Sequence, residues 1–153
     1  MADIISLLNY EEGFSAKPYY CSAGYPTIGI GQRIGPKGAP LNLYEFTVSK
    51  SLASVWLAEK VKETLADMDK HPNIKAAMAV CNESRQAILI SMAYQMGAEG
   101  LSKFTNTLKS VADARWHDAQ SGMLASKWAR QTPNRANRHA IQMLTGNWYP
   151  EYK

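Results

Sequence analysis

The residues of this 153-residue chain whose types and spacing best suit chemistry are Glu12, Cys21 and Thr27. Glu12 falls at the end of a predicted helix, where the helix dipole disfavours the ionised carboxylate and so favours the protonated form that a general acid needs. Cys21 opens a predicted hairpin loop and Thr27 begins the returning strand, in which Gly29 and Gly31 leave room for an extended substrate. Taken alone, the same residues also fit a solvated surface glutamate and an inert cysteine.

A short helix and a hairpin must position these residues. Asp3 is a suitable N-cap for a helix over residues 3–12, which Gly13 ends. Residues 17–20 and 27–30 predict two strands joined by a loop, and residues 31–46 predict a loop with one further short strand. The Gly and Pro residues concentrated between 24 and 40 mark this segment as turn-rich within a chain that is otherwise helical.

A long helix is predicted from Thr47 or Ser49 up to His71-Pro72, which stops it. About twenty residues at 1.5 Å each span roughly 30 Å, enough to join two lobes. One apolar stripe is expected along it, made of Val48, Leu52, Val55, Trp56, Ala58, Val61, Leu65 and Met68.

The remainder of the chain predicts helices over residues 73–80, 84–96, 105–112, 113–122 and 123–130. A last helix has Thr132 as N-cap, Pro133 as its first residue and Gly146 as its stop. Trp116, Trp128 and Trp148 are expected in packing roles, with the indole N–H of Trp128 hydrogen-bonded.

Composition excludes several classes of protein. With 46% hydrophobic and 20% charged residues the chain fits an ordinary globular protein and not a disordered, collagen-like or coiled-coil one. The net charge is +4, and residues 71–153 hold ten Lys and Arg against five Asp and Glu, a net +5. This distribution suggests a surface that attracts a polyanion, although an ordinary basic protein would show it too.

Cysteine and histidine usage predicts no disulfide framework, no metal and no cofactor. Cys21 and Cys81 are interpreted as free thiols in a reducing compartment. His71, His117 and His139 lie far apart, without carboxylates at ligand spacing. The N-terminal segment has no signal-peptide features, and no segment predicts a membrane span.

Four ordered motifs give the chain a resemblance to a known family. Glu12, Cys21 and Thr27 with the following Ile-Gly-Ile-Gly resemble the Glu–Asp/Cys–Thr triad of T-even-type phage lysozymes, glycoside hydrolase family 24. Residues 94–97 (Tyr-Gln-Met-Gly), residues 104–106 (Phe-Thr-Asn) and Trp128 with residues 131–135 (Gln-Thr-Pro-Asn-Arg) match in the same order. The resemblance spans essentially the whole chain, with a shortened connection around residues 35–47.

The resemblance implies an α+β fold in a single lysozyme-like domain over residues 1–153. A small lobe of about residues 13–47 with a β-hairpin would pack with a linking helix of about residues 48–70. A larger all-helical lobe would hold residues 71–153 and the N-terminal helix 3–12, with the active cleft between the lobes. The activity implied is a muramidase that cleaves the β-1,4 bond between N-acetylmuramic acid and N-acetylglucosamine in peptidoglycan.

The resemblance also implies roles for single residues. Glu12 is the general acid, Cys21 stands where the second carboxylate usually lies, and Thr27 helps hold the attacking water. Whether Cys21 is a weak base, a water-positioning group or a nucleophile stays open, with inversion of the anomeric centre favoured; a free thiol is a poor base unless Lys17 or a backbone N–H stabilises its thiolate.

Further candidates are assigned to substrate binding and to support of the site. The substrate-binding candidates are Arg33, Tyr94 and Thr107, and the supporting ones are Gln95 and Arg135, with Arg135 expected near Glu12. Three of the further positions depart from the family: Arg33 stands where an apolar residue is usual, Gly122 where an Asn would contact substrate, and Gln32 where a His is usual.

The protein is expected to be a monomeric phage endolysin that accumulates in the host cytoplasm. A holin would give it access to the cell wall, where it would lyse the host and release phage. The alternative that the chain is a domain of a tail protein stays open. It would insert in no membrane and bind no nucleic acid. The alternatives are a catalytically impaired peptidoglycan-binding protein and a basic nucleic-acid-binding module, whose best support is the capped helix carrying Arg135 and Arg138.

Overall fold

The computed structural model describes all of residues 1–153 and divides them into two compact units. The small unit is Leu8–Lys60, and the large unit is Met1–Leu7 together with Val61–Lys153. A three-stranded antiparallel sheet and eight α-helices confirm the predicted α+β class. The prediction of one domain with a cleft between its lobes stays a prediction.

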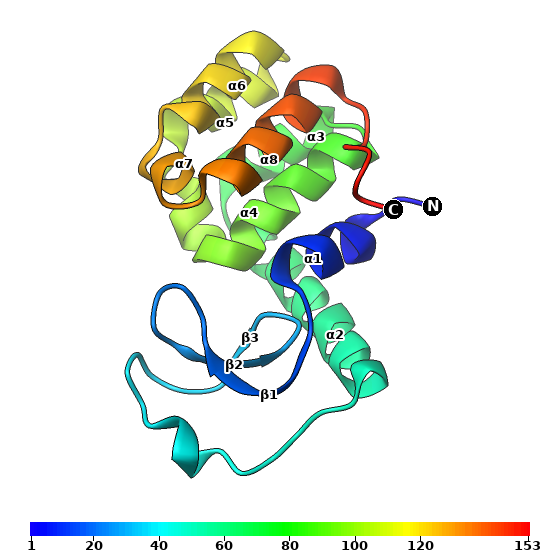
Figure 1. Cartoon of the computed structure of the whole chain (residues 1–153). Coiled ribbons are helices and arrows are strands. Elements are labelled where there is room, and N and C mark those ends of the chain that lie inside the picture. The colour runs from blue at the N-terminus through cyan, green and yellow to red at the C-terminus, as the bar shows by residue number, and fades with distance from the viewer. The chain divides into compact units, whose positions relative to one another are not determined.

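The sheet of the small unit contains the predicted hairpin and the further short strand. Strands β1 (Ser15–Tyr20), β2 (Pro26–Gly29) and β3 (Gln32–Arg33) lie in the order β1-β2-β3, each antiparallel to its neighbour (Figure 1). A short 3₁₀ turn, η1 (Leu41–Leu43), follows in the loop that leads to α2. The prediction of strands around a turn at residues 22–25 is therefore confirmed.

Helix α1 (Ile4–Glu12) begins with the predicted cap. The Ser6 backbone N–H donates to Asp3 Oδ1 at 2.8 Å, and the Asp3 N–H donates to Ser6 Oγ at 2.9 Å. This reciprocal pair satisfies N–H groups that a helix start leaves without intrahelical partners. At the other end Gly13 adopts a φ of +66°, a left-handed conformation that favours glycine and ends the helix directly after Glu12.

Helix α2 (Lys50–Asp69) is capped by Ser49, whose Oγ accepts from the Leu52 N–H at 3.1 Å. The apolar stripe expected along it is only partly right, because Leu52 and Val55 are 54% and 62% exposed. The exposed fraction of Leu65 is 39%. The buried positions recur mainly at intervals of four, as one face of a helix requires, and are Ala53, Leu57, Val61 and Met68.

The sheet explains why that face of α2 is the buried one. All four residues of β2 are buried, and a Cβ added to Gly29 would lie 3.3 Å from the Ala53 Cβ. A glycine facing an alanine lets strand and helix approach closely, so Ala53 is buried in place of the larger Leu52. The packing thereby fixes the strand that carries Thr27.

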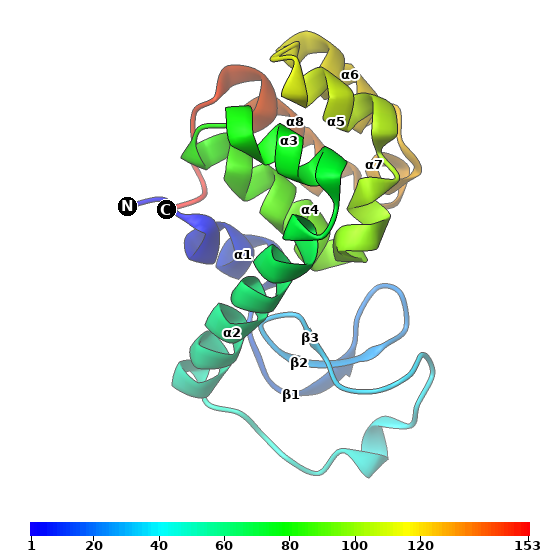
Figure 2. The same ribbon diagram turned by 180° about the vertical axis from the view of Figure 1, so that it is seen from behind.

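The large unit is built from six complete helices, seen from both sides in Figures 1 and 2. Helix α8 packs against α4, α6 and α7, while α5 packs against α3 and α6. Their bounds are α3 (Pro72–Val80), α4 (Glu83–Ser102), α5 (Thr105–Ala112), α6 (Trp116–Leu124), α7 (Lys127–Gln131) and α8 (Pro133–Thr145).

Several helix ends differ from the predictions: the helix predicted over residues 123–130 is divided, since α6 continues to Leu124 and α7 begins at Lys127 after its cap Ser126, and further differences have local backbone reasons. Helix α4 continues beyond Met96 through a kink at Gly97, whose φ is +83°. Helix α6 begins at Trp116 because Ala114, with a φ of +56°, interrupts the preceding turn. Thr132 is not a side-chain cap, since its hydroxyl donates to the Trp128 carbonyl at 3.0 Å.

Candidate active site

Glu12 lies in the small unit against a turn of the sheet. A Cβ added to Gly31, which joins β2 to β3, would lie 2.5 Å from Glu12 Oε2 and 2.9 Å from its Cδ. The backbone of this turn therefore approaches the carboxyl group more closely than any residue with a side chain would allow, and its φ of +68° also favours glycine. The end of α1 and the β2–β3 turn together fix the position of the carboxyl group.

Cys21 lies in the loop that joins β1 to β2. Its backbone N–H donates to the Tyr25 carbonyl at 3.0 Å, and its carbonyl accepts from the Gly24 N–H at 2.9 Å. Gly24 has a φ of +84°, which lets the chain reverse within this loop. The thiol is partly buried and is held by a turn whose backbone groups are themselves hydrogen-bonded.

Thr27 is the central member of a row of side chains across the sheet. It pairs directly with Tyr19 on β1 and with Arg33 on β3. Directly opposite residues on antiparallel strands project from the same face, so these three side chains share one face of the sheet. Thr27 is only 3% exposed, and its hydroxyl donates to the Tyr25 carbonyl at 2.8 Å.

Arg33 is held over an aromatic ring. Its guanidinium carbon lies 3.5 Å from the centre of the Tyr25 ring, within the range of a cation–π interaction. Because the Tyr25 carbonyl also accepts from the Cys21 N–H, the stack holds the guanidinium beside the loop that carries the thiol. The positively charged group predicted to bind substrate is thus part of the environment of Cys21.

The thiol of Cys21 is stabilised as its thiolate. Partial burial acts to raise its pKa, but hydrogen bonds from the backbone N–H groups of Tyr25 and Ala23 act in the opposite direction, as does the neighbouring Thr27 side chain. The positive charge of Arg33 adds to them, and together they lower the pKa of Cys21 below its ordinary value. Backbone N–H groups were one of the two stabilising sources expected; the charge that acts is that of Arg33 rather than Lys17.

Tyr19 is a site residue that the sequence analysis missed. Burial raises the pKa of its phenol, and the negative charges of Glu12 and Cys21 raise it further. The phenol is therefore close enough to sense both groups, and it stays a neutral hydrogen-bond donor at neutral pH. Strand register could have revealed it, because Tyr19 is the cross-strand partner of Thr27.

The remaining candidates belong to the large unit. Tyr94 is half-buried on α4, and beside it Gln95 accepts from the Trp128 indole N–H at 2.8 Å. That bond confirms the predicted pairing of Trp128 and makes Gln95 a support for this aromatic side chain. Arg135 is buried on α8, where its guanidinium donates to Ser91 Oγ at 2.9 Å; its expected pairing with Glu12 stays a prediction.

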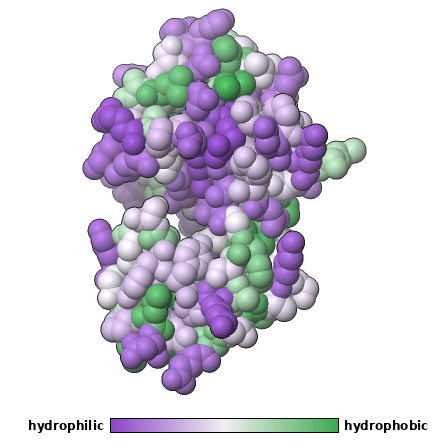
Figure 3. Space-filling model, in the orientation of Figure 1, coloured by the Kyte–Doolittle hydropathy of each residue, from purple (hydrophilic) through white to green (hydrophobic).

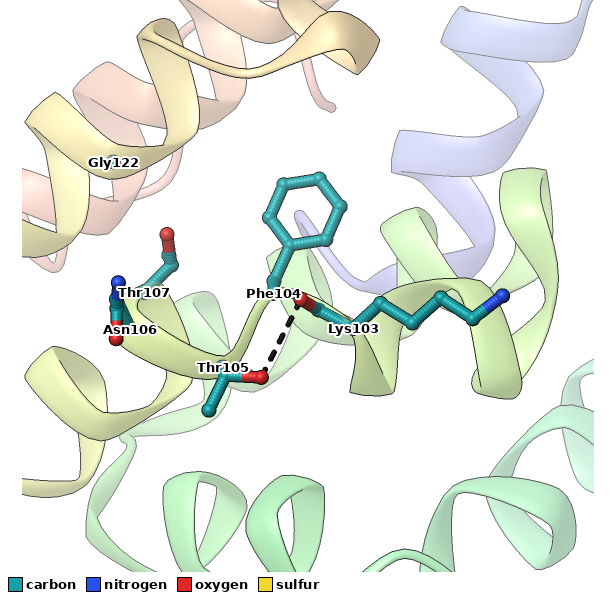
Figure 4. A pocket seen from close by; sticks show the side chains of 6 residues that line it. All are labelled: Lys103, Phe104, Thr105, Asn106, Thr107 and Gly122. Carbon is teal, nitrogen blue, oxygen red and sulfur yellow. Dashed lines mark hydrogen bonds between the residues drawn. The ribbon is translucent and has the colours of Figure 1, made fainter.

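Thr107 lines a pocket of the large unit with a volume of about 430 Å³. Figure 4 shows the other lining residues, which are Lys103, Phe104, Thr105, Asn106 and Gly122. A Cβ at Gly122 would collide with the Thr107 hydroxyl, so the glycine found in place of the family's usual Asn leaves space for that hydroxyl. Asn106 and Thr107 offer polar groups to the pocket, which Phe104 also lines, a combination suited to a polar ligand with an apolar face.

The structure contains no group of three His, Cys, Asp or Glu side chains that could hold a metal ion. None of its helices combines the length and the apolar character that crossing a membrane requires.

The fold is that of an α+β protein whose small unit holds a carboxyl group, a thiol with a lowered pKa and a buried hydroxyl. Comparison with protein families gives a match to the phage lysozyme model over residues 9–144. This match covers most of the chain, and the chain therefore belongs to the phage lysozyme family.

Similar proteins differ widely in length. The chain is 29% identical over 157 residues to the pre-baseplate central spike protein Gp5 of Enterobacteria phage T4, covering 92% of this chain but 27% of that protein. It is 26% identical over 163 residues to a probable T4-type lysozyme 1 of Dictyostelium discoideum, covering 95% and 96%. It is 30% identical over 132 residues to the peptidoglycan hydrolase gp36 of Pseudomonas phage phiKMV, covering 86% of this chain and 14% of that protein.

Proposed function

We propose that the protein is a peptidoglycan hydrolase, and specifically a muramidase that cleaves the β-1,4 bond after N-acetylmuramic acid. Membership of the phage lysozyme family and similarity to proteins named lysozyme and peptidoglycan hydrolase support the wall substrate. The single observation that carries the proposed chemistry is the grouping of ionisable side chains in the small unit. Glu12 lies against Gly31, and the charges of Glu12 and Cys21 both act on the Tyr19 phenol. An acid and a second ionisable group are what glycoside hydrolysis needs.

In the proposed reaction Glu12 donates its proton to the leaving oxygen as the glycosidic bond breaks. A water molecule held by Thr27 and Cys21 attacks the anomeric carbon from the opposite face, and its proton passes to the Cys21 thiolate. Direct attack by water inverts the configuration. The lowered pKa of Cys21 supports this assignment, because it increases the fraction of the group able to accept that proton.

The bond cut is tested by digesting purified peptidoglycan, reducing the products with borohydride and analysing them by mass spectrometry. A muramidase leaves reduced N-acetylmuramic acid at the new end, whereas a glucosaminidase leaves reduced N-acetylglucosamine. Glu12→Gln serves as the inactive control. Retention of the protein on peptidoglycan without product release would instead support the wall-binding alternative, and binding to duplex DNA without product release would support the nucleic-acid-binding alternative.

We further propose that the protein acts as a monomeric endolysin, which accumulates in the host cytoplasm and reaches the wall after a holin opens the membrane. Family membership supports a role in phage lysis. Expression in bacterial cells with and without a pore-forming holin tests this setting. Lysis that needs the holin is expected, and lysis without it would contradict the proposal; light scattering would give the oligomeric state.

A further inference from the structure

The small unit contains a positive charge that the family resemblance does not lead one to expect. Arg33 stands on β3 where an apolar residue is usual, and Cys21 stands where a carboxylate is usual. A carboxylate is ionised at neutral pH without assistance, whereas an ordinary thiol with a pKa of about 8.5 is only a few per cent ionised. A protein that uses a thiol in this position needs a means of ionising it.

Three contacts place the Arg33 guanidinium where it can serve this purpose. Strand register sets Arg33 opposite Thr27, on the same face of the sheet. The cation–π stack, at 3.5 Å from the ring centre of Tyr25, restricts the otherwise flexible side chain. The hydrogen bond from the Cys21 N–H to the Tyr25 carbonyl, at 3.0 Å, ties the residue under the guanidinium to the thiol-bearing residue.

Among the charged groups near the thiol, Arg33 is the cation that acts on it; Lys37 packs against Gly24 of the same loop but does not act on the thiol. Tyr25 and Ala23 offer backbone N–H groups and Thr27 a hydroxyl, all of which are neutral. Tyr19 is a neutral phenol. Glu12, whose charge acts on that phenol, is negative when ionised and so supplies no positive charge. The hydrogen bonds to the Cys21 thiol depend on the backbone of the loop and cannot be removed singly. The charge of Arg33 is the stabilising contribution that one surface substitution can remove.

We propose that Arg33 is a positioning residue that, held on the Tyr25 ring, keeps Cys21 as the thiolate that accepts the proton of the attacking water. The inference rests on the proposed function. The water O–H bond breaks as its oxygen bonds to the anomeric carbon, the proton goes to Cys21 Sγ, and the glycosidic oxygen leaves with the proton of Glu12. Loss of the thiol proton to solvent and uptake of a proton by Glu12 restore the starting state.

This role differs measurably from substrate binding, which was predicted for Arg33 from the resemblance. A group that only binds substrate changes KM and leaves the ionisation of the free thiol unchanged. A group that holds the thiolate changes the titration of Cys21 in the free protein. It also moves the acid limb of the rate profile, where the base becomes protonated.

The experiment compares Arg33→Met and Arg33→Lys with the wild type. Lys17→Met is the matched control, because it removes an exposed cation from the same sheet that does not act on the thiol. The rate of alkylation by iodoacetamide is measured against pH, together with kcat and kcat/KM on peptidoglycan. Burial raises the pKa of Cys81 to about 11, so the second thiol reacts slowly, and Cys81→Ser removes it altogether.

Arg33→Met is expected to raise the alkylation midpoint of Cys21 by about half a pH unit, which is the effect of one nearby exposed charge. Alkylation at pH 7 then slows about threefold, and the acid limb of kcat moves by the same half unit. Arg33→Lys should recover part of the shift, and added salt should reduce it. Lys17→Met should leave both profiles unchanged.

A midpoint that moves no further in Arg33→Met than in Lys17→Met would overturn the proposal, as would a change confined to KM. A midpoint that moves while the acid limb of kcat stays in place would overturn it as well, because the thiolate would then not limit the reaction. Failure of the proposed function appears separately, as a wild-type protein that releases no fragments from peptidoglycan. The circular dichroism of each variant confirms that the fold is retained.

Discussion

The two units of this protein use different means to hold their polar groups. In the small unit the groups that could react are positioned by tight backbone turns at Gly13, Gly24 and Gly31 and by the register of three short strands. In the large unit a buried chain of side-chain hydrogen bonds joins Arg135, Ser91, His139 and Tyr152. The first arrangement leaves Glu12 and Cys21 partly exposed, and the second removes polar groups from water.

The two units also differ in how many of their apolar side chains are buried. Of the 29 buried apolar residues, six belong to the small unit and 23 to the large unit. Conversely, seven of the twelve exposed large apolar residues lie in the small unit. Hydrophilic side chains cover much of the face of the large unit seen in Figure 3, which agrees with a more complete burial of its apolar side chains. This difference predicts that the large unit supplies most of the stability, while the residues proposed to carry the chemistry lie in the small unit.

The sharpest test of this division is Glu12→Gln. We expect the rate of peptidoglycan hydrolysis to fall by at least the 10²–10⁴-fold typical of a general acid, because the amide cannot donate the required proton. The free energy of unfolding should hold or rise, since the change removes a negative charge from a helix C-terminus. Turbidity clearing and denaturant unfolding measure the two quantities. A variant with more than a tenth of wild-type activity would contradict the assignment.

A smaller loss of activity is expected at Cys21, where two substitutions separate the open mechanisms. Cys21→Asp should remain active, because a carboxylate can accept the proton of water. Cys21→Ser should lose roughly 10–10²-fold, because its hydroxyl holds water but hardly ionises. NMR of the first-formed anomer should show inversion. Three results would together establish a thiolate nucleophile instead. Cys21→Ser would have no activity above background, the wild-type rate would rise at alkaline pH, and the first-formed product would retain the anomeric configuration.

Sequence patterns predicted the elements of both units because their signals are local. The Asp3 cap, the glycines around the hairpin and the stop at Gly146 each depend on neighbours within a few residues. The buried face of α2 was predicted less well, because Leu52 and Ala53 are one residue apart and packing against Gly29 decides between them. The size of a strand residue distant in the sequence is not visible in the periodicity of the helix.

The site shows the same limit. Glu12, Cys21 and Thr27 could be selected by type and spacing, but Tyr19 and Tyr25 could not, because their roles depend on strand register and on the direction of a carbonyl. The environment of Arg33 required the structure as well, since an aromatic ring eight residues away positions it. Residue types and their spacing suggested the candidate residues, and the three-dimensional contacts showed which groups surround them.

The contrast between the cores predicts unequal protection from hydrogen exchange. Amides of residues 17–46 should exchange faster than those of residues 84–96, because the first segment has little buried apolar surface and the second is the largely buried part of α4. Mass spectrometry of peptides after timed deuterium labelling measures this. Equal protection of the two segments would show that the units unfold only together, and the comparison of their stabilities would then fail.

The smallest expected effect is a dependence of stability on pH that arises from the large unit. His139 is fully buried, with Nε2 2.7 Å from Ser91 Oγ and Nδ1 3.0 Å from the Tyr152 hydroxyl. Burial lowers the pKa of His139 well below its ordinary value, and the charges of Arg135 and Arg138 lower it further. The ring is therefore neutral in the folded protein near pH 7 and becomes protonated more readily when the chain unfolds.

Because protonation favours the unfolded chain, the stabilising effect of the neutral ring is fully present above the ordinary pKa of about 6.5. As the pH falls below that value, the free energy of unfolding should decrease with a slope approaching about 1.4 kcal/mol per pH unit from this residue. The decrease continues down to the lowered pKa of the folded state. Denaturant unfolding at several pH values between 7 and 5 measures the slope.

His139→Gln should be less stable at pH 7 but should have a shallower slope, since the group that titrates is gone. His117→Gln, at an exposed histidine of α6, is the matched control and should keep the wild-type slope. Equal slopes in all three proteins would mean that the buried network of the large unit takes up no proton on unfolding. The pH dependence of stability in this range would then arise from groups other than His139.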